Sequence, residues 1–484
     1  MRNNEKKVLL INPANFGESW GPLKKGGGIN PPLGLLYLSS VLKKNGFKVF
    51  FLDANIQNLT AKEAEKYIRE VSPDIVGITA VTATFNYALE YLKVIKKINP
   101  KILTVIGGPH ISAVQSIKDY QEIDIGVIGE GEYTFLEICE KYEKEKGELL
   151  EKEKIKGIVF RKGEEEIKNE ARPLIANLDE LPIPDYKILG DIRKYRVQID
   201  AYRKYPVGTI ISSRGCPYHC IFCDRNIFGN RYRAHSPERI IEEIKILVKE
   251  MGCREIKFVD DMFTLQKERV DKICELIKKE KLKFNWSCSL RADFFYEDML
   301  KKMKEAGLWM VNVGIESGNQ EILKKIKKSL KLETVSKTVS LANKLGIYVR
   351  GFFILGHPGE TKETMEDTLK FVKSLPLYTA QFSLATPFIG TELFYIAEKY
   401  GYRDLNINQY SEKFPVFIPE GLTKEDLLKM HRRCYKEFYL RPKQLLKYLL
   451  MLRSFSDLKR YYLGLSILIN MIIEFILYKR RGKK

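Results

Sequence analysis

The most informative stretch of this 484-residue chain is Gly215-Cys216-Pro217-Tyr218-His219-Cys220-Ile221-Phe222-Cys223-Asp224, which holds three of its eight cysteines in the spacing C-x3-C-x2-C. A structural zinc site is closed by four protein ligands, and no second Cys or His pair stands near this loop. A 4Fe-4S cluster held by only three thiolates leaves one iron open to another ligand. The spacing therefore predicts an iron–sulfur cluster with Cys216, Cys220 and Cys223 as its ligands.

This loop resembles the hallmark of the radical S-adenosylmethionine (SAM) superfamily, C-x3-C-x-(aromatic)-C, with Phe222 as the aromatic residue. In that family SAM chelates the open iron, and one electron from the cluster cleaves its sulfonium to a 5′-deoxyadenosyl radical. The resemblance implies a 4Fe-4S cluster, SAM and an electron donor such as ferredoxin or flavodoxin. The alternative is that the three cysteines are only buried together or form disulfides. The other five cysteines stand singly, which indicates a reducing interior without a disulfide framework.

After the connector to this loop, short apolar strands alternate with amphipathic helices such as 238–249 and 267–279. Six strand–helix units favour an open (β/α)6 barrel, as in the superfamily that the loop resembles. Reactive groups should then lie at the carboxyl ends of the strands. The expected strands are 208–212, 256–259, 284–288, 310–314, 349–355 and 380–384.

Polar residues follow these strands, and the resemblance implies that they hold SAM. Asp260 or the carbonyls beside it would bind the amino group, and Arg291 would pair with the carboxylate. Each residue alone is weak support, because a charged residue at a strand end is often only a surface ion pair. The full set expected to contact SAM is Phe222, Asp260, Arg291, Glu316, Arg350 and Gly356.

The first third of the chain shows another alternation, with strands at 8–11, 49–52, 75–78 and 103–106 and helices at 33–45, 61–70 and 87–98. This order predicts a doubly wound parallel sheet, whose ligands sit beyond the carboxyl ends of its strands. Glycines there let a bulky ligand approach the backbone closely. The candidate ligand-binding residues are Thr79, Gly107, Gly108, Pro109, His110, Gly129, Glu130, Gly131 and Glu132.

The order of strand, Gly-Gly-Pro-His, strand, Gly-Glu-Gly-Glu resembles the cobalamin-binding domain at the front of many radical SAM proteins. One departure is that Asn55 stands where other cobalamin proteins carry the histidine that ligates cobalt. The resemblance therefore implies cobalamin bound without that histidine. His110 either contacts the corrin or is a loop histidine bonded to backbone. A nucleotide or flavin is the alternative ligand, although no G-x-G-x-x-G opens a helix here.

Between these regions we expect a solvated Lys/Glu helix at 141–156, a hairpin at 155–166 and an extended proline-containing linker. A second lysine-rich segment, 324–331, should also be solvated. The expected organisation is a Rossmann-like cobalamin domain at 1–145, a hairpin and linker at 146–204, the partial barrel at 205–400 and a helical C-terminal region at 401–484.

The C-terminal end combines positive charge with an apolar run. Residues 424–484 carry 16 Lys or Arg against 5 Asp or Glu, which is a large part of the formal net charge of +20. Residues 461–478 contain one charge, Glu474, between basic flanks. The tail is expected either to rest on anionic lipid or to pack against the barrel. No secretory signal opens the chain, so we expect a cytoplasmic location, with peripheral membrane contact if the tail is an anchor.

The resemblances together imply an α/β enzyme that uses a 4Fe-4S cluster, SAM and cobalamin to methylate an unactivated carbon of a lipid or other small molecule. The first alternative is a cobalamin-assisted radical cyclisation or rearrangement without methyl transfer. The non-enzymatic alternative is a metal-binding module at a membrane surface. A methylthiotransferase acting on RNA would need a second cysteine cluster, which is missing, so no nucleic-acid partner is expected.

Overall fold

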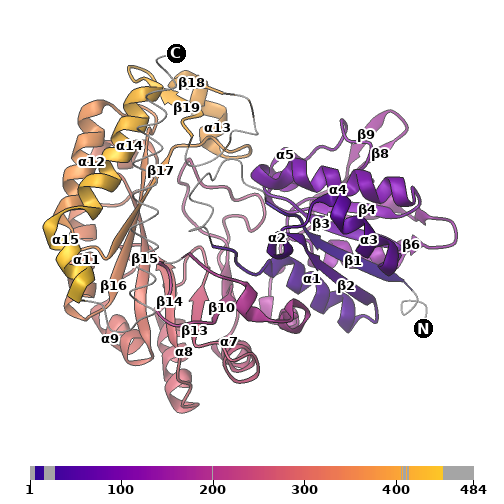
Figure 1. Cartoon of the computed structure of the whole chain (residues 1–484), viewed down its shortest axis with the longest axis horizontal. Coiled ribbons are helices and arrows are strands. Elements are labelled where there is room, and N and C mark those ends of the chain that lie inside the picture. Colours follow the sequence, from indigo (N-terminus) through magenta and orange to yellow (C-terminus); the bar gives the residue numbers. More distant parts are fainter. Residues whose placement is uncertain are drawn as a thin grey trace.

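The computed structural model describes residues 6–15, 28–198, 200–404, 406, 410 and 414–450. Within these residues the chain forms two α/β units that lie side by side, followed by a helical C-terminal region (Figure 1). The apolar tail that the sequence predicts to be an anchor or a buried helix, 458–484, lies outside the described residues.

The first unit is a seven-stranded sheet made, in spatial order, of β2 (Lys48–Asp53), β1 (Lys7–Asn12), β3 (Ile75–Thr79), β4 (Leu103–Gly107), β5 (Ile125–Val127), β8 (Ile158–Lys162) and β9 (Glu165–Lys168). Its main helices are α1 (Leu33–Lys44), α3 (Ala61–Val71), α4 (Phe85–Ile98) and α6 (Glu132–Lys141). β1 to β5 pair in parallel, whereas β8 and β9 pair antiparallel.

Alternate residues of β1 enter two different cores. Leu9 and Ile11 pack with residues of α3 and α4, whereas Val8 and Leu10 pack with residues of α1 and α6. Helices on both faces bury a parallel sheet throughout, which explains the continuous apolar run of this strand. The predicted doubly wound fold is therefore confirmed.

The second unit is a parallel sheet of six strands: β10 (Val207–Ile210), β13 (Glu255–Phe258), β14 (Asn285–Leu290), β15 (Leu308–Glu316), β16 (Tyr348–Leu355) and β17 (Thr379–Leu384). The intervening helices are α7 (Pro237–Lys245), α8 (Lys267–Lys279), α9 (Glu297–Glu305), α10 (Gln320–Lys325), α11 (Leu332–Lys344) and α12 (Lys362–Ser374). Helices cover the outer side of this curved sheet (Figure 1). The predicted six-stranded partial barrel is confirmed, and Trp286 and Trp309 are buried in this unit.

The expected solvated helix at 141–156 is wrong. α6 ends at Lys141, and a hairpin of β6 (Tyr142–Glu143) and β7 (Glu148–Leu149) follows, then a short turn, η4 (Lys152–Lys154). The reason is Tyr142, whose ring is buried and whose hydroxyl donates to the carbonyl oxygen of Lys101 at 3.0 Å. That anchor turns the chain back onto the first sheet.

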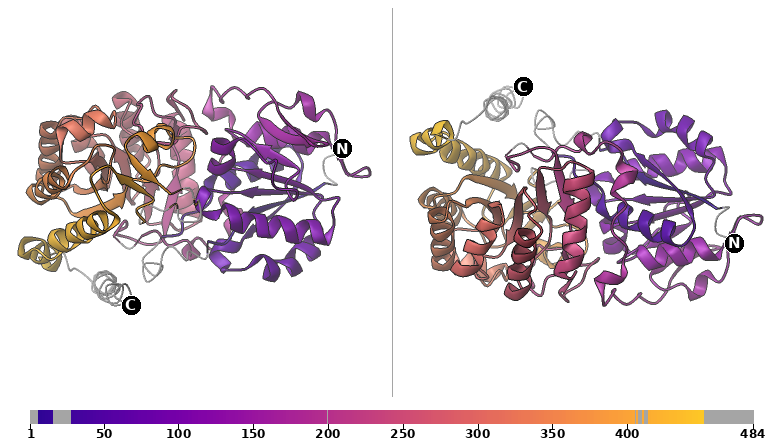
Figure 2. Two further views of the ribbon diagram at one scale, coloured as in Figure 1. Left: turned by 90° about the horizontal axis from the view of Figure 1, so that it is seen from above. Right: turned by 90° about the horizontal axis from the view of Figure 1, so that it is seen from below.

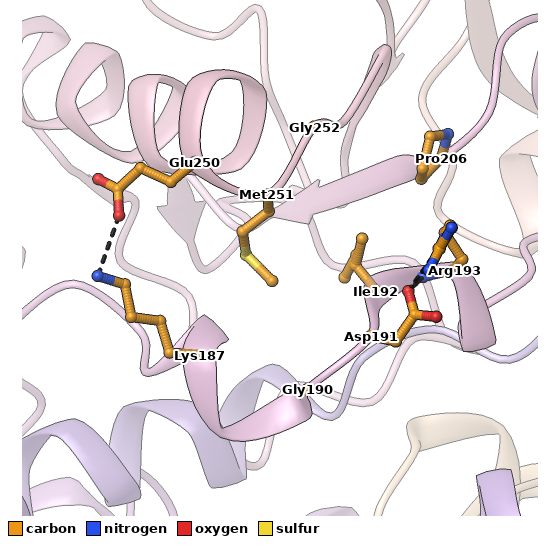
Figure 3. A pocket seen from close by; sticks show the side chains of 9 residues that line it. All are labelled: Lys187, Gly190, Asp191, Ile192, Arg193, Pro206, Glu250, Met251 and Gly252. Carbon is orange, nitrogen blue, oxygen red and sulfur yellow. Dashed lines mark hydrogen bonds and ion pairs between the residues drawn. The ribbon is translucent and has the colours of Figure 1, made fainter.

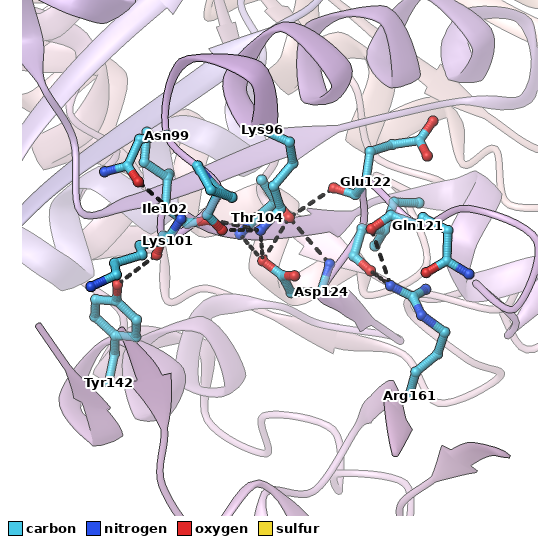
Figure 4. Close-up of polar contacts among 12 residues, drawn as sticks. Lys96, Asn99, Lys101, Ile102, Thr104, Gln121, Glu122, Asp124, Tyr142 and Arg161 are labelled. Atoms are coloured by element: carbon cyan, nitrogen blue, oxygen red, sulfur yellow. Dashed lines mark hydrogen bonds and ion pairs between the residues drawn. The ribbon is translucent and has the colours of Figure 1, made fainter. Parts of the chain in front are cut away.

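A polar network fixes the edge of the first sheet (Figure 4). Asp124 accepts hydrogen bonds from the N–H and the hydroxyl of Thr104, both at 2.8 Å, and pairs with Lys96 at 2.5 Å. Arg161 of β8 donates to four backbone carbonyls within 117–123. The hairpin predicted at 155–166 is present as β8–β9 and forms one edge of the first sheet.

The C-terminal region begins with α13 (Glu392–Ile396) and the short pair β18 (Gly401–Arg403) and β19 (Phe417–Pro419), followed by α14 (Lys424–Tyr439) and α15 (Pro442–Leu450). α14 and α15 lie on the side of the barrel remote from the first unit (Figure 2). Tyr435 and Tyr439 donate their hydroxyls to carbonyl oxygens of β17, at 3.1 and 2.8 Å, which covers this edge strand. Among the helices that the structure describes, none has the length and apolar character needed to cross a membrane.

Candidate active site

The three cysteines lie in a loop whose entry is held by backbone geometry. Just before the loop, β11 (Ser213–Arg214) pairs antiparallel with β12 (Arg233–Ala234). Gly215 then has a φ of +84°, and a Cβ at this position would lie 2.4 Å from the carbonyl oxygen of Arg231. Only glycine accommodates both conditions. The residue before Cys216 therefore sets the direction in which the cysteine loop leaves the sheet.

Asp260 and Asp261, at the end of β13, hold this entry from the side. The Asp260 carboxylate is buried and accepts hydrogen bonds from the N–H and hydroxyl of Ser212 at 2.7 and 2.5 Å and from the hydroxyl of Ser213 at 2.6 Å. Asp261 accepts from the N–H of Gly215 at 3.2 Å. Asp260 therefore positions the cysteine loop, and its oxygens are occupied by the protein.

The cysteines differ in their surroundings. Cys220 is buried, and its pKa is lowered because Cys223 donates a hydrogen bond to its sulfur and because Lys328 and Arg291 place positive charge nearby. Neighbouring cations favour the thiolate, the form that ligates metal. Within the described part of the chain no three His, Cys, Asp or Glu side chains are arranged around a single metal ion. The donor set, three thiols on one loop, fits a cluster in which each thiolate binds its own iron.

The ring of Phe222, in the cysteine loop, lies beside the segment that follows β16. Its ring centroid is 5.8 Å from that of His357, which is fully buried and whose two ring nitrogens have no hydrogen-bond partner among the described residues. Burial and the nearby Lys328 lower the pKa of His357 to about 3, so the ring is neutral. Glu360 accepts hydrogen bonds from the N–H groups of Gly356 and His357 at 2.5 and 2.8 Å. The loop containing Gly356 is thus buried and held by hydrogen bonds from its own backbone to Glu360.

Glu316 ends β15 and pairs with Lys328 at 2.9 Å, with both side chains less than one-tenth exposed. The expectation that 324–331 is solvated is therefore wrong at Lys328. The physical reason is that Leu323 and Leu330 on either side are buried, which turns this lysine inward. The Lys328 ammonium lies 6.0 Å from the Phe222 ring centroid, so this ion pair adjoins the cysteine loop.

Arg291, at the end of β14, stacks on the ring of Tyr218 in the cysteine loop, 3.7 Å from its centroid. Its Nε and Nη2 donate to Asp293 at 2.9 Å, and Nη2 also donates to the carbonyl oxygen of Ser329 at 3.1 Å. Its Nη1 is buried and has no partner within the described ranges. One edge of a buried guanidinium therefore remains available beside the cysteines, as carboxylate recognition requires.

Arg350 is not brought together with these residues. It is the third residue of β16, five residues before the end of that strand. Its Nη2 donates to Gln198 and Gln381 at 2.7 and 3.0 Å and lies 3.3 Å from Asp200. Of the six residues expected to contact SAM, the other five lie at or beside the cysteine loop or the strand ends.

In the first unit, Gly107 is the last residue of β4, and Gly108 precedes α5 (Pro109–Val114). Gly108 has a φ of +96°, and a Cβ there would meet the Thr79 hydroxyl at 2.7 Å. The loops after β3 and β4 are thus in contact and present partly exposed backbone. A Cβ at Gly129, after β5, would have no atom within 4 Å, so the space directly beside this glycine is open.

His110 does not face the same edge as these glycines. It is 3% exposed, its ring centroid lies 4.0 Å from that of Phe85, and its Nδ1 is 3.3 Å from the hydroxyl of Thr82. Burial lowers its pKa to about 4. This histidine packs inside the unit, so contact with a ligand at the loop surface would require it to move.

Glu130 and Glu132 are buried in ion pairs with the barrel. Glu130 pairs with Arg214 and Arg233, both at 2.8 Å, and also accepts from the N–H of Ile175 at 2.8 Å. Glu132 pairs with Arg214 at 2.6 Å. Their expected role in binding a ligand is therefore replaced by a structural one. In the sequence, the position of Arg214 directly before Gly215 was the one indication of a role at the cysteine loop. Nothing in the sequence indicated that Glu130 and Glu132 pair with it.

A second contact between the units lies close to the cysteine loop. A Cβ on Gly390, in the loop after β17, would lie 2.9 Å from the Cβ of Ala113 in α5. Asn226, just after the cysteines, donates to the carbonyl oxygen of Gly390 at 3.3 Å. The helix that follows Gly107 and Gly108 therefore adjoins the barrel edge that carries the cysteines.

A separate surface pocket of about 650 Å³ is lined by Lys187, 190–193, Pro206 and 250–252 (Figure 3). Lys187 and Glu250 bridge it at 3.0 Å. Pro206 and Gly252 precede β10 and β13, so this pocket lies at the amino ends of the strands. Reactive groups of such sheets lie at the opposite, carboxyl ends, and the pocket is not part of the candidate site.

Comparison with known proteins identifies both units. Residues 210–372 match the model of the radical SAM superfamily, and residues 21–139 match that of the B12 binding domain. An uncharacterized methyltransferase of Pyrococcus horikoshii, PH0819, is 40% identical over 87% of this chain and 90% of its own length. The anaerobic magnesium-protoporphyrin IX monomethyl ester cyclase of Cereibacter sphaeroides is 29% identical over 90% of this chain and 70% of its own length. The cobalamin-dependent SAM radical enzyme OxsB, solved with aqua-cobalamin and SAM, has a similar fold, with a TM-score of 0.76 at 19% identity over 98% of this chain and 73% of that one.

Proposed function

Since this chain belongs to the cobalamin-dependent radical SAM enzymes, we propose that it transfers a methyl group to an unactivated carbon of a small-molecule or lipid substrate. The radical SAM region implies a 4Fe-4S cluster and SAM, and the B12 binding region implies cobalamin. The chemistry that these groups supply when bound is one-electron cleavage of a sulfonium, hydrogen-atom abstraction and methyl transfer. The chain's own residues hold and orient the reactants.

The observation that carries the proposal is that the ligand loops of the two units adjoin. α5, which begins after Gly108, contacts Gly390 beside the cysteine loop, and Glu130 and Glu132 pair with Arg214 two residues before Cys216. A methyl group can pass between two cofactors only if both reach the same substrate carbon. Contact between these loops supports that arrangement.

For SAM, we assign the carboxylate to the free Nη1 edge of Arg291 and the amino group to Glu316 or to backbone carbonyls after Asp260. Glu316 and Lys328 neutralise each other, so the pair adds polarity beside the cysteine loop without net charge. The backbone at Gly356, which is bonded to Glu360, and the ring of Phe222 would border the adenine side.

For cobalamin, we assign the contacts to the backbone of Thr79, 107–109, Gly129 and Gly131, which carries few side chains to obstruct a large ring. The segment that would hold a cobalt-ligating histidine is already engaged within the protein. Asp53 accepts from the hydroxyl of Tyr195 at 2.8 Å and caps the short helix α2 (Ala54–Gln57). This supports the binding of cobalamin without a cobalt-ligating histidine.

Two partners complete the proposal. A one-electron donor such as ferredoxin or flavodoxin must reduce the cluster, and a net charge of +20 favours association with an acidic protein. The basic apolar tail favours contact with anionic lipid. Deleting 458–484 should release the protein from anionic liposomes and leave its cluster absorption intact, whereas unchanged partition would refute the anchor.

The test of the function is isotope labelling in cells that are fed methyl-deuterated methionine. Extracts of cells with and without the gene are compared by mass spectrometry, with the triple variant Cys216→Ala, Cys220→Ala, Cys223→Ala as the inactive control. A compound that gains a fully deuterated methyl group only with the wild-type gene is expected. The purified wild-type protein should also be brown under anaerobic conditions and take up one hydroxocobalamin, whereas a colourless protein would refute the proposal.

The second candidate function is a radical cyclisation or rearrangement, which the similarity to a magnesium-protoporphyrin IX monomethyl ester cyclase favours. The same labelling experiment separates the two. A gene-dependent product without the deuterated methyl group would favour cyclisation or rearrangement.

A further inference from the structure

The inner face of the six-stranded sheet is polar. Along each strand alternate residues face the outer helices and belong to the apolar core, for example Ile256 and Phe258 of β13 and Val311 and Val313 of β15. Strand alternation places their neighbours on the other face. These neighbours include Lys257, Ser287, Ser289, Asn312, Arg350 and Gln381. The interior of a closed barrel of this type is normally filled with branched apolar side chains, so this face is built to contact something polar.

Several polar atoms on this face are buried without a partner. The Ser287 hydroxyl, the Asn312 carbonyl oxygen and the Arg350 Nε make no hydrogen bond among the residues that the structure describes. The three residues are 0%, 6% and 5% exposed. Leaving such an atom unsatisfied costs about 1–3 kcal/mol. Three of them on adjacent strands indicate that a ligand or water completes their hydrogen bonds.

Two cations, Arg350 and Lys257, share this face with two anions, Asp200 and Glu255. Arg350 is held by Gln198 and Gln381 through its Nη2 and faces Asp200 at 3.3 Å. Lys257 makes no hydrogen bond or ion pair in the described structure, and its pKa is lowered to about 8, chiefly by burial and then by the charge of Arg350.

The second acidic residue on this face, Glu255 of β13, already accepts hydrogen bonds from the protein. Glu255, two residues before Lys257, accepts from Trp309 Nε1 and from the N–H groups of Arg203 and Lys204, all at 2.8 Å. These donors are neutral, so Glu255 keeps its charge, and the face holds two cations and two anions. Of the two cations, Arg350 pairs with Asp200, and Lys257 has no ion pair in the described structure.

An apolar surface continues from Arg350 toward the cysteine loop. Phe352 and Ile354 follow it on the same face of β16, and the guanidinium lies 5.3 Å from the Phe352 ring centroid. At about 3.3 Å per residue, Arg350 lies roughly 16 Å from Leu355 at the strand end. An anionic group bound at Arg350 would leave the rest of an elongated molecule running over apolar side chains toward the reactive edge.

On the premise of the proposed function, we propose that the substrate is an amphipathic carboxylic acid whose carboxylate is bound by Arg350 and Lys257 on the inner face of the barrel. The Lys257 ammonium, which has no ion pair in the described structure, and the unpartnered Nε of Arg350 are positively charged donors that match the two oxygens of a carboxylate. Asn312 and Ser287 supply neutral hydrogen bonds nearby. The carbon that reacts lies toward Ile354, away from the acid group.

The test is calorimetric titration of the cluster- and cobalamin-loaded protein with three matched probes: hydrocinnamate, its neutral amide, and phenethylphosphonate. Hydrocinnamate should bind at one site at least about tenfold more tightly than the amide, as loss of one charge-assisted contact predicts. Arg350→Gln and Lys257→Gln should each remove this difference, and Arg350→Lys should retain part of it. The control variants Arg69→Gln and Lys337→Gln, on exposed helix faces, should bind like wild type.

Equal affinity for acid and amide, or an unchanged preference in both inner-face variants, would overturn the inference. Phenethylphosphonate binding tenfold more tightly than hydrocinnamate would also overturn it, in favour of a phosphoryl group. Lys257→Gln leaves the pair of Arg350 with Asp200 intact, so its result holds even if Arg350→Gln unfolds. The titration measures binding without turnover, and the labelling experiment measures methyl transfer. Failure of the carboxylate site and failure of the proposed function can therefore be told apart.

Discussion

Replacing Arg214 by Met should destabilise the protein by about 3–5 kcal/mol, because it breaks two buried ion pairs and leaves a buried carboxylate without a cation. The Arg214 side chain is 2% exposed and bonds Glu130 and Glu132 at 2.8 and 2.6 Å. Glu130 keeps Arg233, also at 2.8 Å. Glu132 has no other ion pair in the described structure, so most of the loss comes from its uncompensated charge.

A double-mutant cycle isolates this contribution. Glu132→Gln should cost about 1–3 kcal/mol, because Arg214 retains Glu130. The double variant should then cost less than the two single changes added together, with a coupling energy of about 1.5–3 kcal/mol, as expected for residues in direct contact. The coupling has this sign because, in the double variant, methionine replaces the cation and glutamine replaces the carboxylate, so no unpaired charge is left buried at this pair.

The assay is guanidinium unfolding followed by far-ultraviolet circular dichroism, with the free energies of the variants compared with that of wild type. The matched control is Arg69→Met, which breaks an exposed pair with Glu65 at 2.7 Å and should change the free energy by no more than about 1 kcal/mol. The reasoning is refuted if Arg214→Met lowers the free energy of unfolding by no more than Arg69→Met does. It is also refuted if the change in the double variant equals the sum of the changes in the two single variants.

Three further perturbations test other contacts. His110→Phe should make stability less dependent on pH in the acid range. The pKa of His110 is about 4 in the folded chain, below its value in the unfolded chain, so the stability present above pH 6.5 is lost as the pH falls toward 4. About 2 kcal/mol of the free energy of unfolding should be lost by pH 5 in wild type, as measured by urea unfolding at both ends of this range. Lys328→Met should lower the free energy of unfolding by about 3 kcal/mol, because Glu316 is left buried and unpaired. The control Lys324→Met changes an exposed side chain and should change this free energy by less than about 0.5 kcal/mol. Equal losses in the two variants would contradict the pairing of Lys328 with Glu316. Gly108→Val should prevent stoichiometric uptake of hydroxocobalamin, since its Cβ would meet the Thr79 hydroxyl at 2.7 Å, and unchanged uptake would exclude this loop from the site.

Local features of the chain made most of the fold predictable. The cysteine spacing lies within eight residues, and the strands and helices of both units are read from periodicities of a few residues. Six parallel strands in chain order follow from that alternation, since each strand–helix unit packs beside the last. The wrong helix at 141–156 arose where charge alone was considered, because the buried contact of Tyr142 with Lys101 joins segments 41 residues apart.

The partners of the buried charges were decided by the tertiary structure. Glu130 and Glu132 follow a strand end, where ligand contacts are common, yet they bond Arg214, more than 80 residues away. Arg350 belongs to the right strand but lies at its far end, facing Asp200 and Lys257, and Lys328 enters the interior from a segment that reads as solvated. The sequence by itself determined the cysteine loop, the two sheets and the loops at their carboxyl ends, because these depend on neighbouring residues. Which charges meet depends on how the two units and their connector pack, and burial makes each such charge require its particular partner.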